Sequence, residues 1–433
     1  MRDGPQRHTV RNRCPQHFKT MHTHLAPQYQ DSPDANAAAA ILRKCVHCGF
    51  CTATCPTYQL LGDELDGPRG RIYLIKQVLE GQAPTRKTQA HLDRCLTCRN
   101  CESTCPSGVA YGHLVDIGRK LVDAQVPRAP TERAVRWVLK QGLTSSAFGP
   151  AMKIGQLLRP LLPASLKDKV PARQDGGAWP TAVHGRKVLM LAGCVQPAMT
   201  PNINSATARV LDAAGIQSVI AADAGCCGAV KFHLNDQEGG KAHMRANIDA
   251  WWPYLQDGVE AIVMNASGCG VTVKEYGHLL RDDPAYAARA ARVSELTRDL
   301  SELLPELVGA LRGKVRPDAR TLAFHPPCTL QHGQQLRGGV EHWLGELGFD
   351  IKVTGAEAHL CCGSAGTYSV LNPELSKQLR ERKLGHLQTT FGARAPDLIV
   401  SANMGCITHL QSGTRTPVRH WVEVLDEALQ QAT

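Results

Sequence analysis

The sequence predicts an α+β protein of several domains, in which a mainly helical N-terminal domain precedes two repeated α/β modules. Three observations support this fold class. A run of four cysteines at 45–55 recurs at 95–105. A second cysteine pattern occurs twice in the C-terminal part of the chain, and around each copy short apolar strands alternate with helical stretches.

The composition is that of an ordinary globular protein, with 433 residues, 43% of them hydrophobic and 20% charged. No apolar run approaches the roughly 18 residues of a membrane span, and the first twenty residues lack the apolar core of a secretory signal. We therefore expect a cytoplasmic protein whose cysteines bind metals rather than form disulfides. The net charge of +10 is spread along the chain, which does not favour nucleic acid but allows peripheral contact with a membrane.

The first two cysteine runs predict a ferredoxin-like domain. Both have the spacing C-x2-C-x2-C-x3-C-P, in which three cysteines hold one [4Fe–4S] cluster and the fourth reaches to the other cluster. We expect one cluster on Cys45, Cys48, Cys51 and Cys105, and the other on Cys95, Cys98, Cys101 and Cys55. Structural zinc would need pairs of cysteines rather than two triplets, each with a trailing Cys-Pro. The cations expected to offset the cluster charge are Arg43, Lys44, Arg94 and Arg99.

Composition and apolar periodicity divide the chain into five expected segments. Residues 1–35 are polar and are expected to be a disordered extension, within which Met21 is an alternative start and Cys14 has no expected role. A connector with a basic amphipathic helix is expected to pack on the chain's own domains, or else on a membrane or partner surface. After the extension, the segments are the helical two-cluster domain at 36–126, this connector at 127–185, and the two modules at 186–312 and 313–433.

The two modules repeat one order of strands and cysteines. The offsets between equivalent cysteines are 134, 135, 135 and 137 residues, too regular for chance. Each module is predicted to contain a parallel sheet, whose strands lead at their carboxyl ends into loops along one edge. We therefore expect two sets of four cysteines to gather there: Cys194, Cys226, Cys227 and Cys269, and Cys328, Cys361, Cys362 and Cys406.

Each Cys-Cys-Gly (CCG) motif is predicted to lie on a turn, because adjacent side chains of a strand point to opposite faces. Gly228 and Gly363 would supply the permissive backbone. This arrangement suits a metal or cluster site, or dithiol chemistry, whereas simple core packing would not need cysteine twice at each position. His409 is an additional candidate ligand and His325 a weaker one, since a lone buried histidine is more often only hydrogen-bonded.

No catalytic residue is predicted. The sequence has no G-x-G-x-x-G after a strand, no phosphate-binding loop and no Ser-His-Asp or paired-carboxylate constellation. Substrate chemistry is therefore expected in another polypeptide, with this chain carrying electrons.

The chain resembles the iron–sulfur subunits of bacterial glycolate oxidase (glycolate dehydrogenase), from about Ala35 to the C-terminus. The C-terminal modules are similar to the CCG modules of heterodisulfide reductase. The final cysteine of that family's motif is missing here, because Thr272 and His409 occupy its position in the two modules. This leaves a four-ligand cluster, zinc or a quinone-facing thiol site open. The segments that carry the resemblance are 45–81, 93–109, 224–230, 266–277 and 359–370.

The resemblance implies a complex in which flavin-containing subunits oxidise glycolate to glyoxylate. This subunit would bind two [4Fe–4S] clusters, with an additional cluster or zinc at the CCG sites, and pass electrons to a quinone or another acceptor. The expected place is the inner face of the cytoplasmic membrane. Alternatives are the equivalent subunit of a lactate or glycerol-3-phosphate dehydrogenase, or a heterodisulfide reductase-like thiol–disulfide enzyme.

Overall fold

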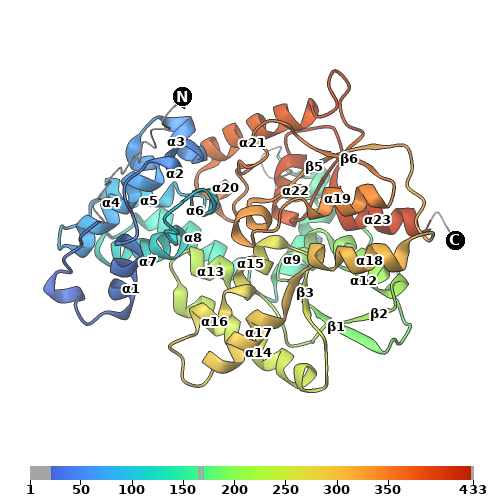
Figure 1. Ribbon diagram of the computed structural model, residues 1–433, viewed down its shortest axis with the longest axis horizontal. Helices are drawn as coiled ribbons and strands as arrows, with labels where there is room; N and C mark the ends of the chain where they lie inside the picture. Colours follow the sequence, from blue (N-terminus) through green and yellow to red (C-terminus); the bar gives the residue numbers. More distant parts are fainter. Residues whose placement is uncertain (1–20, 164–166, 168–169, 431–433) are drawn as a thin grey trace, which may run out of the picture.

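The computed structural model describes residues 21–163, 167 and 170–430. Figure 1 shows a helical region in blue and teal at the left, with two α/β modules at the right, one green to yellow and the other orange to red. This arrangement confirms the predicted fold class of a helical N-terminal part followed by two modules with parallel sheets.

The helical region consists of short helices, and three of its α-helices begin at prolines. Pro33, Pro56 and Pro68 occupy first-turn positions, where the missing N–H has no partner to lose. The core between these helices contains the fully buried side chains of Leu42 and Ile75. The elements are η1 (Pro27–Tyr29), α1 (Pro33–Leu42), α2 (Phe50–Ala53), α3 (Pro56–Leu61), η2 (Glu64–Asp66), α4 (Pro68–Leu79), α5 (Arg86–Asp93), α6 (Asn100–Ser103) and α7 (Tyr111–Gln125).

The expected disordered extension at 1–35 overlaps with this helical region. The side chain of Met21 is buried, and its amide donates a hydrogen bond to the carbonyl of Cys45 over 3.3 Å. Tyr29 also packs against the core, and α1 begins before residue 35. Residues 21–35 therefore belong to the helical region because their apolar side chains cover its core. Residues 1–20, with Cys14, lie outside the described residues.

The connector forms the helices α8 (Pro130–Gly142) and α9 (Phe148–Leu157), followed by the 3-10 turn η3 (Arg159–Leu161). Helix α9 ends at Leu157, shortly before Pro160, which cannot continue the hydrogen-bond ladder. None of the residues of α9 is buried. Among the described residues, no helix combines the length and apolar character needed to cross a bilayer.

Each module contains a four-stranded parallel sheet, and the strand orders are equivalent: β2-β1-β3-β4 and β6-β5-β7-β8. This equivalence confirms the internal repeat. The first module comprises β1 (Arg186–Met190), α11 (Gln196–Met199), α12 (Pro201–Ala213), β2 (Ile216–Val219), α13 (Ala229–His233), α14 (Gln237–Gln256), β3 (Ile262–Met264), α15 (Ser267–Lys274), α16 (Tyr276–Leu279), α17 (Ala287–Leu296), β4 (Thr297–Asp299), η4 (Leu300–Leu303) and α18 (Leu304–Leu311). The second comprises β5 (Thr321–His325), η5 (Thr329–Gly333), α19 (Gly339–Glu346), β6 (Asp350–Val353), α20 (Tyr368–Leu371), α21 (Pro373–Gln388), β7 (Leu398–Ser401), α22 (Met404–Gln411), β8 (Val418–His420) and α23 (Trp421–Gln430).

The two modules share one apolar core. A continuous set of buried side chains extends from Val188 in the first sheet to Phe324 and Trp421 in the second module. Helices α12 and α23 pack against each other, and Arg209 Nη2 lies 2.7 Å from Asp426 Oδ2 across their contact. The shared core fixes how the cysteine-bearing edges of the two sheets face each other.

Candidate iron–sulfur centres

The eight cysteines of the two runs line two neighbouring cavities. One cavity is lined by Cys45, Cys48, Cys51 and Cys105, and Cys101 lines both this cavity and its neighbour. The other is lined by Cys55, Cys95, Cys98 and Cys101. The structure therefore brings together the same two sets of four thiols that the spacing predicts, including the exchanged fourth cysteine of each run. A set of four thiolates is the donor set of a [4Fe–4S] cluster.

Both runs curl in the same way, with left-handed backbone at equivalent positions. His47 and Thr97 have φ values of 55° and 52°, and Gly49 and Arg99 have values of 86° and 57°. Residues other than glycine rarely adopt this left-handed backbone conformation. Backbone strain of this kind is concentrated at functional sites. The left-handed residues turn successive cysteines of each run toward one point.

The two cavities differ in their access to solvent. In the outer cavity Cys48 is exposed, and the neighbouring Phe50 is 60% exposed. In the inner cavity Cys55, Cys95 and Cys101 are buried. Burial raises the pKa of Cys51 to about 11 and that of Cys101 well above its ordinary value, so these thiols hold their protons until a metal displaces them.

Arg71 on α4 provides a buried positive charge at the inner cavity. Its guanidinium donates hydrogen bonds to the carbonyl of His91 over 2.7 Å and to Thr57 Oγ1 over 3.2 Å, and it lies 3.4 Å from Asp66 Oδ1. Burial alone would lower the pKa of Arg71, but the nearby Tyr111, Cys95, Cys55 and Asp66 outweigh it and raise the pKa. Sequence reasoning missed Arg71, because it lies between the runs and only the fold brings it to the thiols.

The predicted cations play varied roles. Arg43 and Lys44 are exposed. Arg94 Nη1 pairs with Asp66 Oδ2 at 2.8 Å, and Arg99 pairs with Glu275 of the first module. At the outer cavity the lining cation is Arg69 instead, held by Glu64 with an Nε–Oε1 distance of 2.6 Å. The arginines that line the two cavities are therefore Arg69 at the outer one and Arg71, with the predicted Arg99, at the inner one.

In the first module the four predicted cysteines come together at the carboxyl edge of the sheet. Cys226 lies in hydrogen-bond contact with both Cys194 and Cys227, and Cys227 with Cys269. The contacts from Cys194 and Cys227 lower the pKa of Cys226, while the contact with Cys226 raises that of Cys194.

The second module repeats the arrangement. Cys328 and Cys361 have their Sγ atoms 3.7 Å apart, and Cys362 contacts Cys406. In both modules the glycine after the pair donates its amide to the first thiol over 3.4 Å: Gly228 to Cys226 and Gly363 to Cys361.

The turn at each CCG motif requires glycine, as predicted. Gly228 and Gly363 have φ values of 92° and 89°. A Cβ at Gly228 would lie 2.6 Å from the carbonyl oxygen of Gly240, and one at Gly363 would lie 2.5 Å from that of Ser376. A side chain is therefore excluded by both backbone conformation and space.

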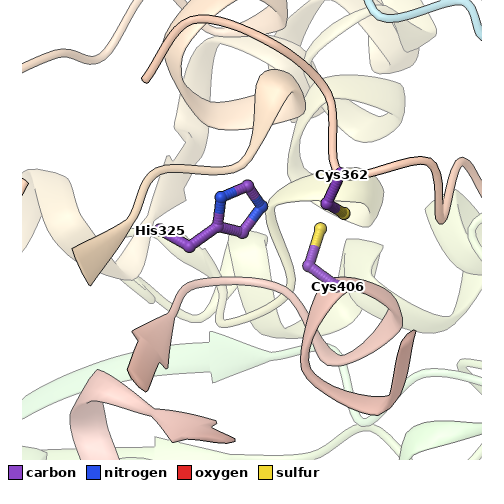
Figure 2. A group of neighbouring side chains, drawn as sticks. All are labelled: His325, Cys362 and Cys406. Carbon is purple, nitrogen blue, oxygen red and sulfur yellow. The ribbon is translucent and has the colours of Figure 1, made fainter. Parts of the chain in front are cut away.

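The two candidate histidines of the second module are both buried but have different surroundings. His409 Nε2 lies 3.2 Å from Ser376 Oγ and 3.3 Å from the carbonyl oxygen of Ser376. His325 has its ring close to Cys362 and Cys406 instead, with the ligand atoms of all three residues within 4.8 Å of one another (Figure 2). The structure thus favours His325, which sequence reasoning ranked below His409.

A single cavity of about 260 Å³ connects these sites. It lies between the helical region and the two modules, and its lining includes Arg99 and Glu275. Cys98 of the inner set packs against a group of buried apolar side chains that includes Cys328 and Cys361. The thiols that line it are Cys98, Cys194, Cys227, Cys269, Cys328, Cys361 and Cys406.

Two four-thiol cages side by side, the inner one next to a cavity lined by thiols of two repeated modules, define an iron–sulfur electron-transfer protein. Comparison with known families agrees with this class. Residues 41–109 match the family described as a 4Fe-4S dicluster domain, and residues 188–274 and 322–411 match the cysteine-rich domain CCG. The protein therefore binds iron–sulfur clusters of the [4Fe–4S] type.

The similarity to individual proteins extends over nearly the whole chain. The chain is 54% identical over 415 residues to the glycolate oxidase iron-sulfur subunit of Escherichia coli, and the match covers 95% of this chain and 100% of that protein. It is 31% identical over 403 residues, 86% of this chain and 89% of the relative, to a probable glycolate oxidase iron-sulfur subunit of Bacillus subtilis. Lactate utilization protein A of Exiguobacterium is 24% identical over 250 residues, 57% of this chain and 99% of the relative. The chain belongs to the family of glycolate oxidase iron–sulfur subunits.

Proposed function

We propose that this chain is the electron-transfer subunit of a complex in which a flavin-containing partner oxidises glycolate to glyoxylate. The observation that supports this role is the line of thiol sites from Cys48 at the surface, through Cys98, to Cys328 in the second module. The substrate is inferred from the names of the two glycolate oxidase relatives described above, and the flavin-containing partner from the family resemblance given in the sequence analysis.

We propose that each ferredoxin-type cage holds one [4Fe–4S] cluster, which takes up and releases one electron at a time when bound. The ligands would be Cys45, Cys48, Cys51 and Cys105 in the outer cage and Cys55, Cys95, Cys98 and Cys101 in the inner cage. Arg69 and Arg71 offset the negative charge of the thiolates. The buried side chains of α1, α4 and α7 exclude water from the inner cage.

The CCG cysteines are proposed to bind further metal at the cavity, where electrons from the inner cage would leave toward a quinone or another acceptor. The proposed sets are Cys194, Cys226, Cys227 and Cys269 in the first module and Cys328, Cys361, Cys362 and Cys406 in the second. The nearness of Cys98 to Cys328 supports this direction of transfer.

The test is dye reduction by the complex, co-purified without oxygen with its flavin-containing partner. We expect reduction with glycolate and little with lactate or glycerol 3-phosphate. The isolated chain should contain no flavin and should oxidise none of the three. Stoichiometric flavin in the isolated chain would contradict the proposed division of labour, and preference for lactate would move the chain to the lactate-oxidising systems.

The exposed apolar side chains of the connector support peripheral contact with the inner face of the cytoplasmic membrane. Trp137 and Ile154 are each 60% exposed, and Leu157 and Leu161 are 80% and 82% exposed. Lys153 and Arg159 lie next to these side chains in sequence and could meet anionic headgroups. Co-sedimentation with phosphatidylglycerol vesicles, weakened by Leu157→Ser and absent with phosphatidylcholine, would support this contact. Equal sedimentation of the variant would oppose it.

A second candidate function is thiol–disulfide reduction at the second module. The Sγ atoms of Cys328 and Cys361 lie 3.7 Å apart, so a small movement would bring them to disulfide distance. Turnover of a disulfide substrate by the isolated, chemically reduced chain, lost in Cys361→Ser, would favour this function over onward transfer to a quinone.

A further inference from the structure

His325 is a buried histidine with no hydrogen-bond partner for either ring nitrogen in the described part of the chain. Its exposed fraction is 1%, at the carboxyl end of β5. Buried polar groups in folded proteins nearly always have a partner, so an imidazole with both nitrogens unpartnered requires an explanation. A bound metal ion would provide one, because it takes the lone pair of one nitrogen.

The ring of His325 faces two thiols from separate elements. Figure 2 shows the imidazole pointing toward the sulfur atoms of Cys362, on the CCG turn, and Cys406, on α22. The ligand atoms of the three residues lie within 4.8 Å of one another, and all three residues are buried. Among the residues that the structure describes, no other set of three metal-binding side chains that includes a cysteine is this compact.

This compactness favours one ion over a cubane cluster. In a tetrahedral site with bonds of 2.0–2.3 Å, neighbouring ligand atoms lie about 3.3–3.8 Å apart. The thiolates of a cube bind different irons and point outward from different corners, so they lie farther apart. Consistent with this, neither ferredoxin-type set of cysteines forms so tight a group in the described residues.

The first module lacks this nitrogen donor. The offset of 134 residues between Cys194 and Cys328 places Leu191 at the position equivalent to His325, and Leu191 is buried and apolar. The two modules share a strand order and the CCG turn but differ at this position. A mixed nitrogen and sulfur donor set is therefore specific to the second module.

We propose that the second module binds a single divalent ion, zinc or iron(II), through His325, Cys362 and Cys406. Imidazole and thiolate together suit both metals. Two thiolates balance the charge of a divalent ion, so the buried site would be neutral overall. Cys406 also lines the cavity shared by the two modules, so a fourth ligand can approach from that side. The inference rests on the proposed metal-binding role of the CCG cysteines and narrows it for one module.

The experiment compares wild type with three variants, purified without oxygen and incubated with Zn²⁺ before desalting. His325→Leu installs the residue of the first module. His325→Cys keeps a donor at the position, and His409→Leu removes the neighbouring histidine. Zinc and iron per chain are measured by mass spectrometry, and the coordination of non-cluster metal by X-ray absorption at the zinc or iron edge. The EPR spectrum after dithionite reports the cubes independently.

We expect His325→Leu to bind one ion per chain fewer than wild type, His325→Cys and His409→Leu, because any metal at the cysteines of the first module would be common to all four proteins. The wild-type X-ray absorption should show imidazole nitrogen together with sulfur, and His325→Cys should show sulfur only. Unchanged cube signals in His325→Leu would establish that the variant is folded.

The proposal is overturned if wild type binds no ion beyond the cubes, or if His325→Leu binds as many ions as wild type. It is also overturned if the ion shows no imidazole scattering. Failure of the electron-transfer proposal would appear differently, as missing cube signals or as absent dye reduction by the complex.

Discussion

Arg99 Nη2 lies 2.7 Å from Glu275 Oε2, which joins the second cysteine run to the first CCG module. Arg99 follows Cys98 directly, and Glu275 lies between α15 and α16. Both side chains are mostly buried, and His113 Nε2 approaches Glu275 Oε1 to 3.1 Å. This ion pair holds the inner cage against the cavity, because it connects the loop of the ligands to the edge of the first module.

Breaking this pair is expected to loosen the helical region from the modules. Glu275→Gln should lower the free energy of unfolding by about 2 kcal/mol, because it leaves the Arg99 charge without its partner. Burial would raise the pKa of Glu275, but hydrogen bonds from His113 and Arg99 outweigh burial and lower it. A lowered carboxyl pKa gives a contribution that is complete above the ordinary value of about 4.3 and is lost as the pH falls through the native value.

Chemical unfolding at pH 7.5, combined with a double-mutant cycle using Arg99→Met, measures this coupling. The exposed pair Arg292–Glu295, with an Nη1–Oε2 distance of 2.7 Å, is the control, and Glu295→Gln should change stability little. Equal effects of the two substitutions would show that the Arg99–Glu275 pair does not connect the regions.

Removing the buried charge of Arg71 is expected to lower the reduction potential of the inner cage. Arg71→Gln should shift it on the order of 50 mV downward, because a nearby positive charge favours the more negative, reduced state. EPR-monitored redox titration measures the shift. Arg71→Lys keeps the charge and should stay close to wild type; a similar shift in both variants would mean that hydrogen bonding, rather than charge, sets the potential.

Loss of one cage ligand should remove one cluster and leave the other. Cys51→Ser is expected to bind roughly half the iron of wild type and to unfold more easily, since cluster binding contributes to folding. Iron and sulfide analysis with EPR checks this outcome. Cys14→Ser, outside both proposed cages and both CCG sets, is the matched control and should keep full iron; full iron in Cys51→Ser would contradict the ligand assignment.

Gly363→Ala should destabilise the second module by about 2 kcal/mol or more, because the new Cβ meets the carbonyl oxygen of Ser376 in a left-handed conformation. Gly385 in α21 has open space at its Cβ position, so Gly385→Ala should be stabilising by roughly 0.5–1 kcal/mol. The apparent unfolding temperatures of the two variants test the difference. If the unfolding temperatures of both variants fell by similar amounts, the destabilisation would arise in helix α21 rather than at the CCG turn.

The cage cysteines and the repeat could be predicted from sequence because both depend on local spacing. Three thiols within seven residues must curl around one centre, and a strand followed by cysteine occurs at matching positions in both modules. Arg71 could not be predicted this way, since helix α4 brings it to Cys55 and Cys95 from a separate part of the chain. The importance of His325 also depends on the fold, because Cys362 and Cys406 are far from it in sequence.

The relative orientation of the two modules, which places both cysteine-bearing edges at one cavity, likewise depends on tertiary packing. The sequence predicts two edges with four cysteines each but says nothing of the angle between the sheets. That angle follows from the shared core and from the contact of α12 with α23, which involve residues more than two hundred positions apart, such as Arg209 and Asp426.

Unequal shielding of the two cages has a consequence for damage by oxidants. Peroxide or superoxide diffusing in water would meet the cage of Cys48 first, while the cage of Cys101 stays protected by its surroundings. Brief aeration should therefore bleach the protein in two stages, with a half-depleted species in between. Repair of the outer cage alone would then restore such a preparation, without the polypeptide having to unfold.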